Sequence, residues 1–383
     1  MVERKLKVSY YGATKTEDGI GLASKLHLNA LKINKSNHNL DLSVKEHILS
    51  RNVGFQNNLK LIDKISIHHL SEEKSHINYF HFSPRWINKY LGKEEKIYLN
   101  NKTNIGYWVC EAQKIPLEWI RNIEFFDEIW TASSFCKRVY EKYLDIPISV
   151  IHHPVIERPI SQRLIKRYKK IEDKPFTFLT IANAFSDLKR KNSLSVIKAF
   201  KLAFKSNDKK VRLVVKLTNT KSDLNEFNKI SSMIEEYKNI HLIKDHCSSE
   251  DIEKLYKLSD VYVSLHRSEG FGLTISDAFS FGIPVIATGY SGNLDILSDS
   301  SNSLLVDYDL INVGEKRLRY YPDDIWAEPD INIAKEKMIK AREEFNNCFD
   351  EAFKVRKNLR KKFNPKIIGE KMIKRITSLA PSR

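Results

Sequence analysis

The chain has 383 residues, of which 42% are hydrophobic and 29% are charged. This composition excludes a disordered chain, and the length predicts two domains of about 150–200 residues each. No apolar run reaches the roughly 18–20 residues that a membrane-spanning helix needs, and the charged N-terminus lacks the apolar region of a signal peptide, so we expect a cytoplasmic protein.

The net charge of the chain is +16, from 64 Lys and Arg against 48 Asp and Glu. A surplus of this size suggests anionic partners, which include nucleic acid, anionic lipid and phosphorylated small molecules. The sequence has no zinc-finger spacing and no aromatic-basic strand motif, so a nucleic-acid function rests on the charge alone. The four cysteines form no C-x-x-C pair, which argues against a zinc site or a disulfide framework.

In the first half of the chain, short apolar runs alternate with segments of helical periodicity. The strand candidates are residues 5–11, 78–83, 105–109 and 127–133, and the helix candidates are 21–33, 116–124 and 134–143. This alternation predicts a parallel sheet with crossover helices.

A second alternation follows a polar, basic stretch at residues 163–175. Its strand candidates are residues 176–182, 211–217, 240–243, 261–265, 284–287 and 303–306, and its helix candidates are 193–204, 221–236, 250–258 and 274–281. Ser248 and Asp251 predict a capping box before the third of these helices. Two consecutive α/β alternations predict a two-lobed enzyme whose ligand lies at the carboxyl ends of the strands.

The segment 264–297 carries the most chemistry. A buried strand brings Glu269 to the carboxyl edge of the sheet, and a helix begins near Leu273. A helix N-terminus beside glycines is an anion site suited to a diphosphate. Glu269 and Asp277 can each accept hydrogen bonds from sugar hydroxyls. The residues of this turn that are predicted to bind the diphosphate-containing ligand are Gly270, Phe271, Gly272, Leu273 and Thr274.

This segment resembles the nucleotide-sugar signature of retaining glycosyltransferases of family four, which have the GT-B fold. In that family a Glu, seven residues and a second Glu frame the donor site. Glu269 matches the first position, and Asp277 stands at the second with a side chain one methylene shorter. Asn293, in the following S-G-N, resembles the loop near the donor sugar.

Residues 185–200 resemble the family segment that supplies an Arg/Lys pair to the donor diphosphate, and Arg190 and Lys191 match that pair. Two fixed cations would stabilise the charge that a leaving nucleoside diphosphate gains. Lys216 ends the next strand at the same edge and is a further candidate. Because cations and a helix start take the place of a metal in such a site, we expect no metal and no other cofactor.

The first half resembles the same family more weakly, over residues 104–136. Many relatives carry a catalytic-site His here, whereas this chain has Cys110 and Glu111, so no His role is transferred. Glu111 is the polar candidate for a contact with donor or acceptor. Gly19 and Gly21 match the family's glycine loop under the donor phosphates.

Three other features suggest less. Asp307-Tyr308-Asp309 spells a D-x-D metal motif, but its place after a late strand predicts a surface loop. His152 and His153 are expected to be structural. A basic stripe at helical spacing predicts either an ordinary surface helix or a helix lying on a membrane; it consists of Arg163, Lys166, Arg167 and Lys170.

The resemblance implies an α/β protein of GT-B fold, with two Rossmann-like domains facing each other across a cleft. We expect an N-terminal domain at 1–158, rejoined by a C-terminal helix at 364–383, and a donor domain at 159–363. The implied activity is metal-independent, retaining transfer of a hexose from a nucleotide-sugar donor to a saccharide or lipid-linked saccharide. Such a reaction would serve bacterial surface polysaccharides, O-antigen or capsule, at the inner face of the cytoplasmic membrane, with no nucleic acid as partner.

Two alternatives stay open. A nucleotide-sugar epimerase of similar architecture would bind the same donor but would need general acid–base carboxylates or histidines. A basic nucleic-acid-binding protein would account for the net charge and would show steeply salt-dependent binding.

Overall fold

The computed structural model describes residues 6–16, 18–38, 40–46, 76–84, 99–244, 246–297, 303–317 and 320–380. The chain forms two compact units. The first unit contains Met1–Cys110, Lys114–Pro154 and Lys362–Arg383, and the second contains Glu111–Gln113 and Val155–Lys361. The last segment of the chain therefore folds with the first unit.

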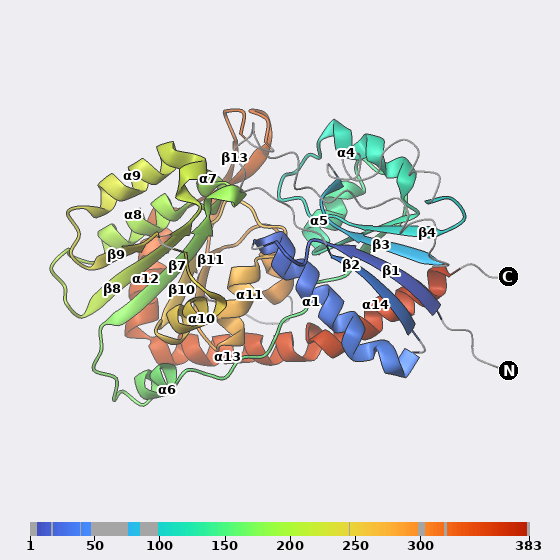
Figure 1. The fold of residues 1–383 in the computed structure, drawn as a ribbon. Helices are drawn as coiled ribbons and strands as arrows, with labels where there is room; N and C mark the ends of the chain where they lie inside the picture. The colour runs from blue at the N-terminus through green and yellow to red at the C-terminus, as the bar shows by residue number, and fades with distance from the viewer. Residues whose placement is uncertain are drawn as a thin grey trace. The chain divides into compact units, whose positions relative to one another are not determined.

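The first unit is built on a six-stranded parallel sheet with helices packed on it (Figure 1). In the spatial order β2-β1-β3-β4-β5-β6, the strands are β1 (Leu6–Gly12), β2 (Leu40–Glu46), β3 (Ile77–His81), β4 (Thr103–Tyr107), β5 (Glu128–Thr131) and β6 (Ile148–Val150). The α-helices among its described residues are α1 (Gly19–Asn34), α4 (Leu117–Arg121), α5 (Ser134–Tyr140) and α14 (Pro365–Leu379).

Helix α14 is held on the first unit by two kinds of contact. Against α1 the backbones approach closely, because a Cβ added at Gly369 would lie only 2.3 Å from the carbonyl oxygen of Ala30. Against the sheet, the guanidinium of Arg375 lies 2.6 Å from the buried carboxylate of Glu128 on β5. The second contact gives the buried Glu128 carboxylate a charged partner, as a buried polar group requires.

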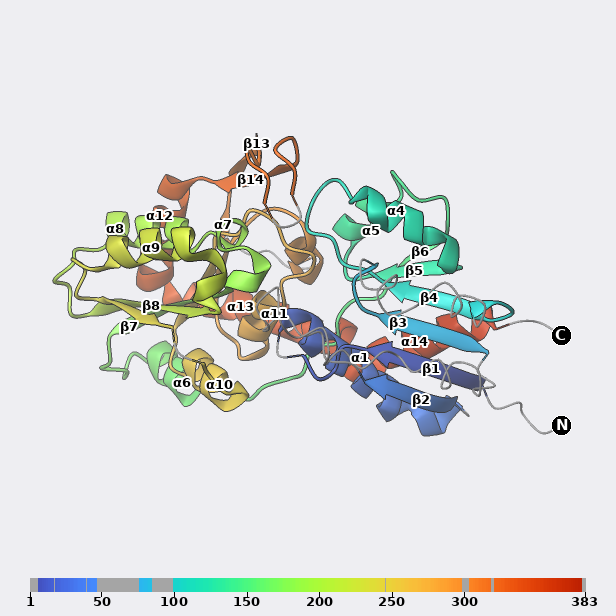
Figure 2. The ribbon, with the colours of Figure 1, turned by 45° about the horizontal axis from the view of Figure 1, so that its top comes forward.

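The second unit has its own six-stranded parallel sheet, in the order β12-β11-β10-β7-β8-β9, and a separate antiparallel hairpin (Figure 2). The sheet contains β7 (Phe176–Asn183), β8 (Val211–Thr218), β9 (Ile240–Ile243), β10 (Val261–Ser264), β11 (Val285–Thr288) and β12 (Leu305–Val306). The hairpin contains β13 (Tyr308–Asn312) and β14 (Ile325–Pro329). The α-helices are α6 (Gln162–Tyr168), α7 (Leu188–Lys191), α8 (Ser193–Ala203), α9 (Leu224–Ile234), α10 (Ser249–Lys257), α11 (Leu273–Ser280), α12 (Ile331–Glu343) and α13 (Phe345–Lys362).

The ten strands and seven helices predicted from the two alternations are all present, so the α/β prediction with two Rossmann-like halves is confirmed. The Ser248–Asp251 capping box before α10 is also present. The sequence reading missed β2, whose LDLSVKE run is too polar to read as a buried strand. It missed the hairpin as well: Tyr308 and Asp309 lie in an exposed strand, β13, and not in a surface loop.

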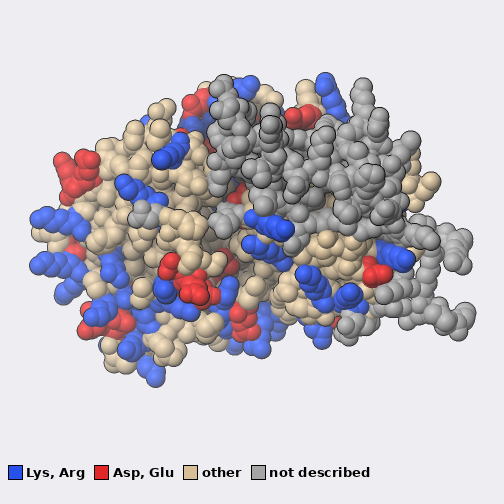
Figure 3. Space-filling model, in the orientation of Figure 1, with Lys and Arg blue, Asp and Glu red and all other residues tan. Residues whose placement is uncertain are grey.

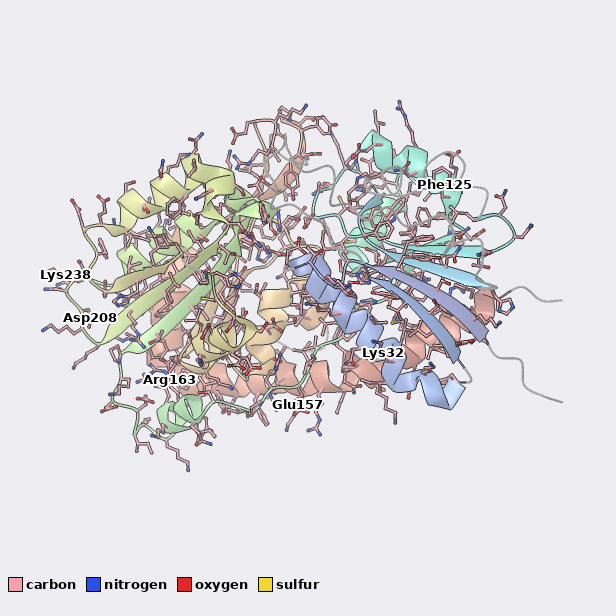
Figure 4. The ribbon with its side chains drawn as sticks, viewed as in Figure 1. Lys32, Phe125, Glu157, Arg163, Asp208 and Lys238 are labelled. Carbon is pink, nitrogen blue, oxygen red and sulfur yellow. The ribbon has the colours of Figure 1, made fainter. Side chains whose placement is uncertain are left out.

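The basic stripe begins on a short helix with exposed positions, α6, and two of its four cations are used inside the unit. Arg163 on α6, labelled in Figure 4, donates to the buried carboxylate of Asp260 at 2.7 Å, and Arg167 donates to it at 3.2 Å. Lys166 and Lys170 are the exposed members of the stripe. Figure 3 likewise shows basic side chains interspersed with acidic ones over the visible face of the second unit. No helix among the described residues has the length and apolarity to span a membrane.

Candidate nucleotide-sugar site

The candidate site forms at the carboxyl edge of the second unit's sheet. Strands β7 and β10 are parallel neighbours, so the segments that follow them leave the sheet at the same edge. After β7 the chain turns into α7, which carries Arg190 and Lys191, and after β10 it runs through Glu269 to α11. The topology thereby brings together the Arg/Lys segment (185–200) and the Glu269 segment (264–297), which are far apart in the sequence.

Glu269 is the centre of the site's charge. Its carboxylate accepts a hydrogen bond from Lys191 Nζ at 2.5 Å and lies 3.3 Å from Arg190 Nη1. Burial alone would raise the Glu269 pKa, but Lys191, Arg190 and His266 outweigh it and lower the pKa to about 2. Glu269 is therefore an anion at neutral pH, and it neutralises the cations that a diphosphate would need.

Arg190 is almost fully buried, at 2% exposure, and its guanidinium is held on several sides. It donates to the carbonyl oxygens of Ser268 at 2.6 Å and Ser186 at 3.2 Å. It also lies 3.5 Å from the carboxylate of Glu111. Lys191 is more exposed, with 16% of its side chain accessible, so it is the more available of the two cations to a ligand.

Glu111 belongs to a three-residue segment that packs into the second unit. Besides the ion pair with Arg190, its carbonyl oxygen accepts a hydrogen bond from the Ser268 hydroxyl. Two residues later, Gln113 donates to the Tyr290 hydroxyl at 2.7 Å. The structure thus places Glu111 among the site residues, with its carboxylate competing for the same cation as Glu269.

The glycine turn begins α11 without a side-chain cap. Gly272 is the N-cap residue at φ +92, a conformation that a residue with a Cβ rarely adopts. A Cβ there would also lie 3.3 Å from the Cβ of Asn293. Phe271 is buried beside Gly270, while Leu273 and Thr274 are half-buried at the helix start. This uncapped N-terminus retains the positive end of its dipole for an anion.

Asp277 lies one turn into α11. Its carboxylate accepts no hydrogen bond from the described residues, and burial raises its pKa from 3.8 to about 6 despite the attraction of Arg158. A half-buried acceptor without a donor can take hydroxyl groups from a ligand.

Asn293 and Lys216 are enclosed by the protein itself. The Asn293 amide donates to Thr288 O at 3.0 Å, and its Oδ1 lies 3.1 Å from His266 Nε2. Lys216 has no exposed surface, and its Nζ donates to the carbonyl of Leu217 at 3.1 Å. Both residues lie close to the edge, yet their polar atoms already have internal partners.

The glycine loop of the first unit has a structural explanation. Asp18 caps α1 by accepting hydrogen bonds from Ile20 N and Gly21 N, both at 2.9 Å. A Cβ at Gly21 would lie 1.8 Å from the carbonyl oxygen of Thr16, so the close turn requires glycine there. Because the Asp18 carboxylate already accepts from the Ile20 and Gly21 N–H groups, this geometry does not favour a phosphate on them.

Two further residues support the site through contacts that the sequence does not predict. Ser291 accepts a hydrogen bond from the Glu269 backbone N–H at 2.8 Å and so fixes the start of the turn. His266 is fully buried and contributes to lowering the Glu269 pKa. The Ser291 contact has no sequence signal, because it depends on how the loops after β10 and β11 meet, whereas His266 lies in the same segment as Glu269.

Comparison with known proteins agrees with this geometry. Residues 161–319 match the family model described as "Glycosyl transferases group 1". Over 66 residues the chain is 41% identical to the probable sucrose-phosphate synthase 5 of rice (Oryza sativa subsp. japonica), a match covering 16% of this chain and 6% of that protein. Over 89 residues it is 32% identical to sucrose-phosphate synthase of Zea mays, covering 22% of this chain and 8% of that protein. The chain thus spans less than a tenth of either curated relative.

Solved structures resemble the chain over nearly its whole length. HepE from Anabaena, in complex with UDP and glucose, has a TM-score of 0.68 at 11% identity, covering 97% of this chain and 100% of that one. Sucrose-phosphate synthase from Thermosynechococcus elongatus has a TM-score of 0.69 at 13% identity, covering 98% and 99%. These similarities confirm the GT-B fold.

Proposed function

We propose that this chain, whose residues 161–319 match the model of the glycosyl transferases group 1 family, transfers a sugar from a nucleoside diphosphate to an acceptor hydroxyl with retention of configuration. The observation that carries the proposal is the cluster of Arg190, Lys191 and Glu269 beside the uncapped start of α11. Because the HepE structure contains UDP, UDP-sugars are the first donors to test.

The proposed donor binds by replacing internal anions. Its diphosphate takes the place of Glu269 on Lys191 and lies at the first turn of α11, where the helix dipole favours negative charge. The ribose hydroxyls donate to the open carboxylate of Asp277. Glu269, released from Lys191, then accepts hydrogen bonds from hydroxyl groups of the sugar that is transferred.

The proposed reaction takes place on one face of the sugar. The bond between the anomeric carbon and the diphosphate oxygen breaks, and the bond to the acceptor oxygen forms on the same side. The leaving oxygen takes the acceptor's proton, so no protein base is required. Lys191 and Arg190 stabilise the charge that the diphosphate gains, as preorganised cations do.

We also propose that the reaction needs no divalent cation, since these two cations can supply the charge. Chelation with EDTA should therefore leave the turnover unchanged. Loss of activity that Mn²⁺ or Mg²⁺ restores would contradict this part of the proposal.

The acceptor we propose is a saccharide or a lipid-linked saccharide of a bacterial surface polysaccharide, O-antigen or capsule, met at the inner face of the cytoplasmic membrane. The net charge of +16 supports an acceptor at an anionic membrane surface, because a positively charged protein is attracted to such a surface. Transfer of labelled sugar to an extracted lipid-linked fraction, compared with free oligosaccharide, tests this choice.

The proposal is tested with two variants after a thermal-shift screen of UDP-, GDP- and dTDP-sugars. Lys191→Ala should weaken nucleoside diphosphate binding and also lower turnover. Glu269→Gln should lower turnover by about 100-fold or more, yet keep or increase the affinity for the free nucleoside diphosphate, because Glu269 competes with it for Lys191.

Lys254→Ala is the matched control, since Lys254 forms an ion pair with Asp251 on the exposed face of α10. It should leave binding and turnover unchanged. Near-normal turnover in Glu269→Gln would contradict the proposed role. Epimerised donor formed without any acceptor would favour an epimerase, and steeply salt-dependent binding of random DNA without donor binding would favour a nucleic-acid function.

A further inference from the structure

Helix α7, which carries both cations, is a single turn bounded by two residues of positive φ. Asn192 follows it in the left-handed helical region, at φ 57 and ψ 42, which Asn adopts readily. Asp187 precedes it at φ 71 and ψ 106. This combination lies outside the left-handed helical region and is sparsely populated by residues other than glycine, so surrounding contacts must hold it.

The Asp187 side chain has two partners that hold this conformation. Its Oδ1 accepts the Arg190 backbone N–H at 3.0 Å, which caps α7. Its Oδ2 accepts a hydrogen bond from Arg317 Nε at 2.7 Å. Arg317 then bridges to Asp223 through Nη2 at 2.8 Å and to Glu315 through Nη1 at 2.9 Å. One guanidinium thus anchors the start of α7 to two other segments of the unit.

The hairpin β13–β14 (Figure 2), which carries Arg317 between its strands, also contacts the Lys189 side chain of α7. Glu315 accepts a hydrogen bond from Lys189 at 2.8 Å, and the Lys189 ammonium lies 5.9 Å from the ring centre of Trp326 on β14. The Arg267 guanidinium also lies over the Trp326 ring, at 5.3 Å from its centre, and pairs with Glu328 on β14 at 2.6 Å. The Arg267 backbone N–H donates to the Arg190 carbonyl at 2.8 Å. The hairpin therefore contacts the side chain of Lys189 directly, and it contacts the α7 backbone only through Arg267.

We propose that Arg317 is a positioning residue: through Asp187 it holds α7 in the conformation that presents Arg190 and Lys191 to a donor diphosphate. The inference rests on the proposed function and adds the hairpin β13–β14 to the donor site. Asp187 is the acceptor through which Arg317 acts, and neither residue need touch the donor. The guanidinium of Arg317 forms ion pairs with three carboxylates among the described residues, those of Asp187, Asp223 and Glu315. These contacts depend both on the positive charge of Arg and on the spread of its N–H groups.

The test compares ligands that differ in one phosphate. For Arg317→Gln, the dissociation constant of UDP should rise about tenfold, while that of UMP should rise less than about threefold, because the loss concerns the cations that hold the second phosphate. Arg317→Lys keeps the charge but cannot bridge three carboxylates, so its UDP affinity should be intermediate. Asp187→Asn keeps the cap and weakens the ion pair, and it should show the same selective loss.

The double variant Asp187→Asn/Arg317→Gln should bind UDP no more weakly than the worse single variant, since both changes break the same contact. Arg342→Gln is the matched control: Arg342 pairs with Asp208 at 3.1 Å, before β8 and hence at the opposite edge of the sheet from α7 (Figure 4). It should leave both affinities unchanged.

Unchanged UDP affinity in Arg317→Gln, or an equal loss for UMP and UDP, would overturn the positioning role. If Arg317→Gln does not fold, Arg317→Lys and Asp187→Asn decide by the same two criteria. Failure of the wild-type chain to bind any nucleoside diphosphate would instead reject the proposed function.

Discussion

The fold favours the neutral form of the Asp277 carboxyl group, whereas the proposed ribose contact uses its ionised form. Its folded pKa of about 6 lies above its ordinary value of 3.8, so the folded state holds the proton more tightly than the unfolded chain does. Ionisation between about pH 4 and pH 6 therefore lowers the free energy of unfolding, by about 1–3 kcal/mol at pH 7.

Asp277→Asn should consequently raise the free energy of unfolding of the unliganded protein by about 1–3 kcal/mol at pH 7, while lowering UDP affinity by about tenfold through the lost charged acceptor. Chemical unfolding at pH 4 and pH 7 with calorimetric titration of UDP measures both effects. The gain in stability should shrink towards pH 4, and an equal gain at both pH values would exclude the carboxyl as its cause.

Asp251→Asn is the control, because the pKa of the exposed Asp251 carboxyl is shifted in the opposite direction: hydrogen bonds from Ser248 and Lys254 lower it. Its removal should not stabilise the protein at pH 7.

For single residues, the sequence predicted which side chains lie together at the sheet edge. It did not predict which ion pairs those side chains form. The spacing of Glu269, Arg190 and Lys191 placed all three at one sheet edge, because parallel strands end there. It could not predict that Glu269 forms ion pairs with both Arg190 and Lys191, because these pairs depend on side-chain geometry. Arg317 had no signal at all: its partner Asp187 is distant in sequence and meets it only through the hairpin.

Among the elements, the strands of the first unit enclose a buried histidine cluster. It consists of His27 on α1, His81 at the end of β3 and His153 after β6, all of them buried. His153 Nδ1 lies 3.2 Å from His27 Nε2, and His27 Nδ1 lies 3.0 Å from the Tyr79 hydroxyl. The other titratable groups facing the cluster are Tyr10, Tyr107 and His152. The expected structural role of His153 agrees with this burial.

Burial and mutual repulsion lower the pKa of each of these histidines, that of His153 to about 3. Below about pH 6.5 the unfolded chain therefore binds protons that the folded first unit does not, and stability falls as the pH falls. For each histidine the slope approaches about 1.4 kcal/mol per pH unit.

His153→Gln should reduce that slope by about 1.4 kcal/mol per pH unit between pH 6 and pH 5. His246→Gln, at an exposed position in the second unit, should leave it unchanged. Urea unfolding followed by tryptophan fluorescence measures the slope, and an unaltered slope in His153→Gln would contradict the assignment.

The elements themselves were the most predictable part of the molecule. Strands buried on both faces read as nearly continuous apolar runs, which is why β7 and β10 were found within a residue or two. Strand β2 and the hairpin β13–β14 lack such runs. Strand β2 alternates apolar and polar residues, and strand β13 is exposed throughout, so neither has the continuous apolar run that marks the other strands. Both are identified by the neighbours with which they pair.

At the scale of the whole molecule, the chain leaves its first unit and returns to it through α14. The return depends on Glu128, whose buried carboxylate is reached by Arg375 of α14 and also accepts from Trp130 Nε1 at 3.0 Å. Removing one partner of a buried ion pair leaves an uncompensated charge, which costs more than the pair itself contributes.

Arg375→Met keeps the aliphatic packing of the side chain and removes its charge, so it should lower the free energy of unfolding of the first unit by about 2–4 kcal/mol. Hydrogen exchange followed by mass spectrometry should show faster exchange in peptides from β1, β4, β5 and α14. Peptides from β7 and β8 should keep their protection, because these strands belong to the other unit.

Arg356→Met is the mirror-image control, since Arg356 on α13 donates to Ser280 O at 2.9 Å and pairs with Glu157 at 3.0 Å within the second unit. It should speed exchange in α11 and α13 and leave the first unit protected. If Arg375→Met sped exchange equally in β7 and β8, the division of the chain into two cooperative units would be wrong. The α14 segment would then stabilise the whole molecule, and every stability measurement proposed above would report on a single transition.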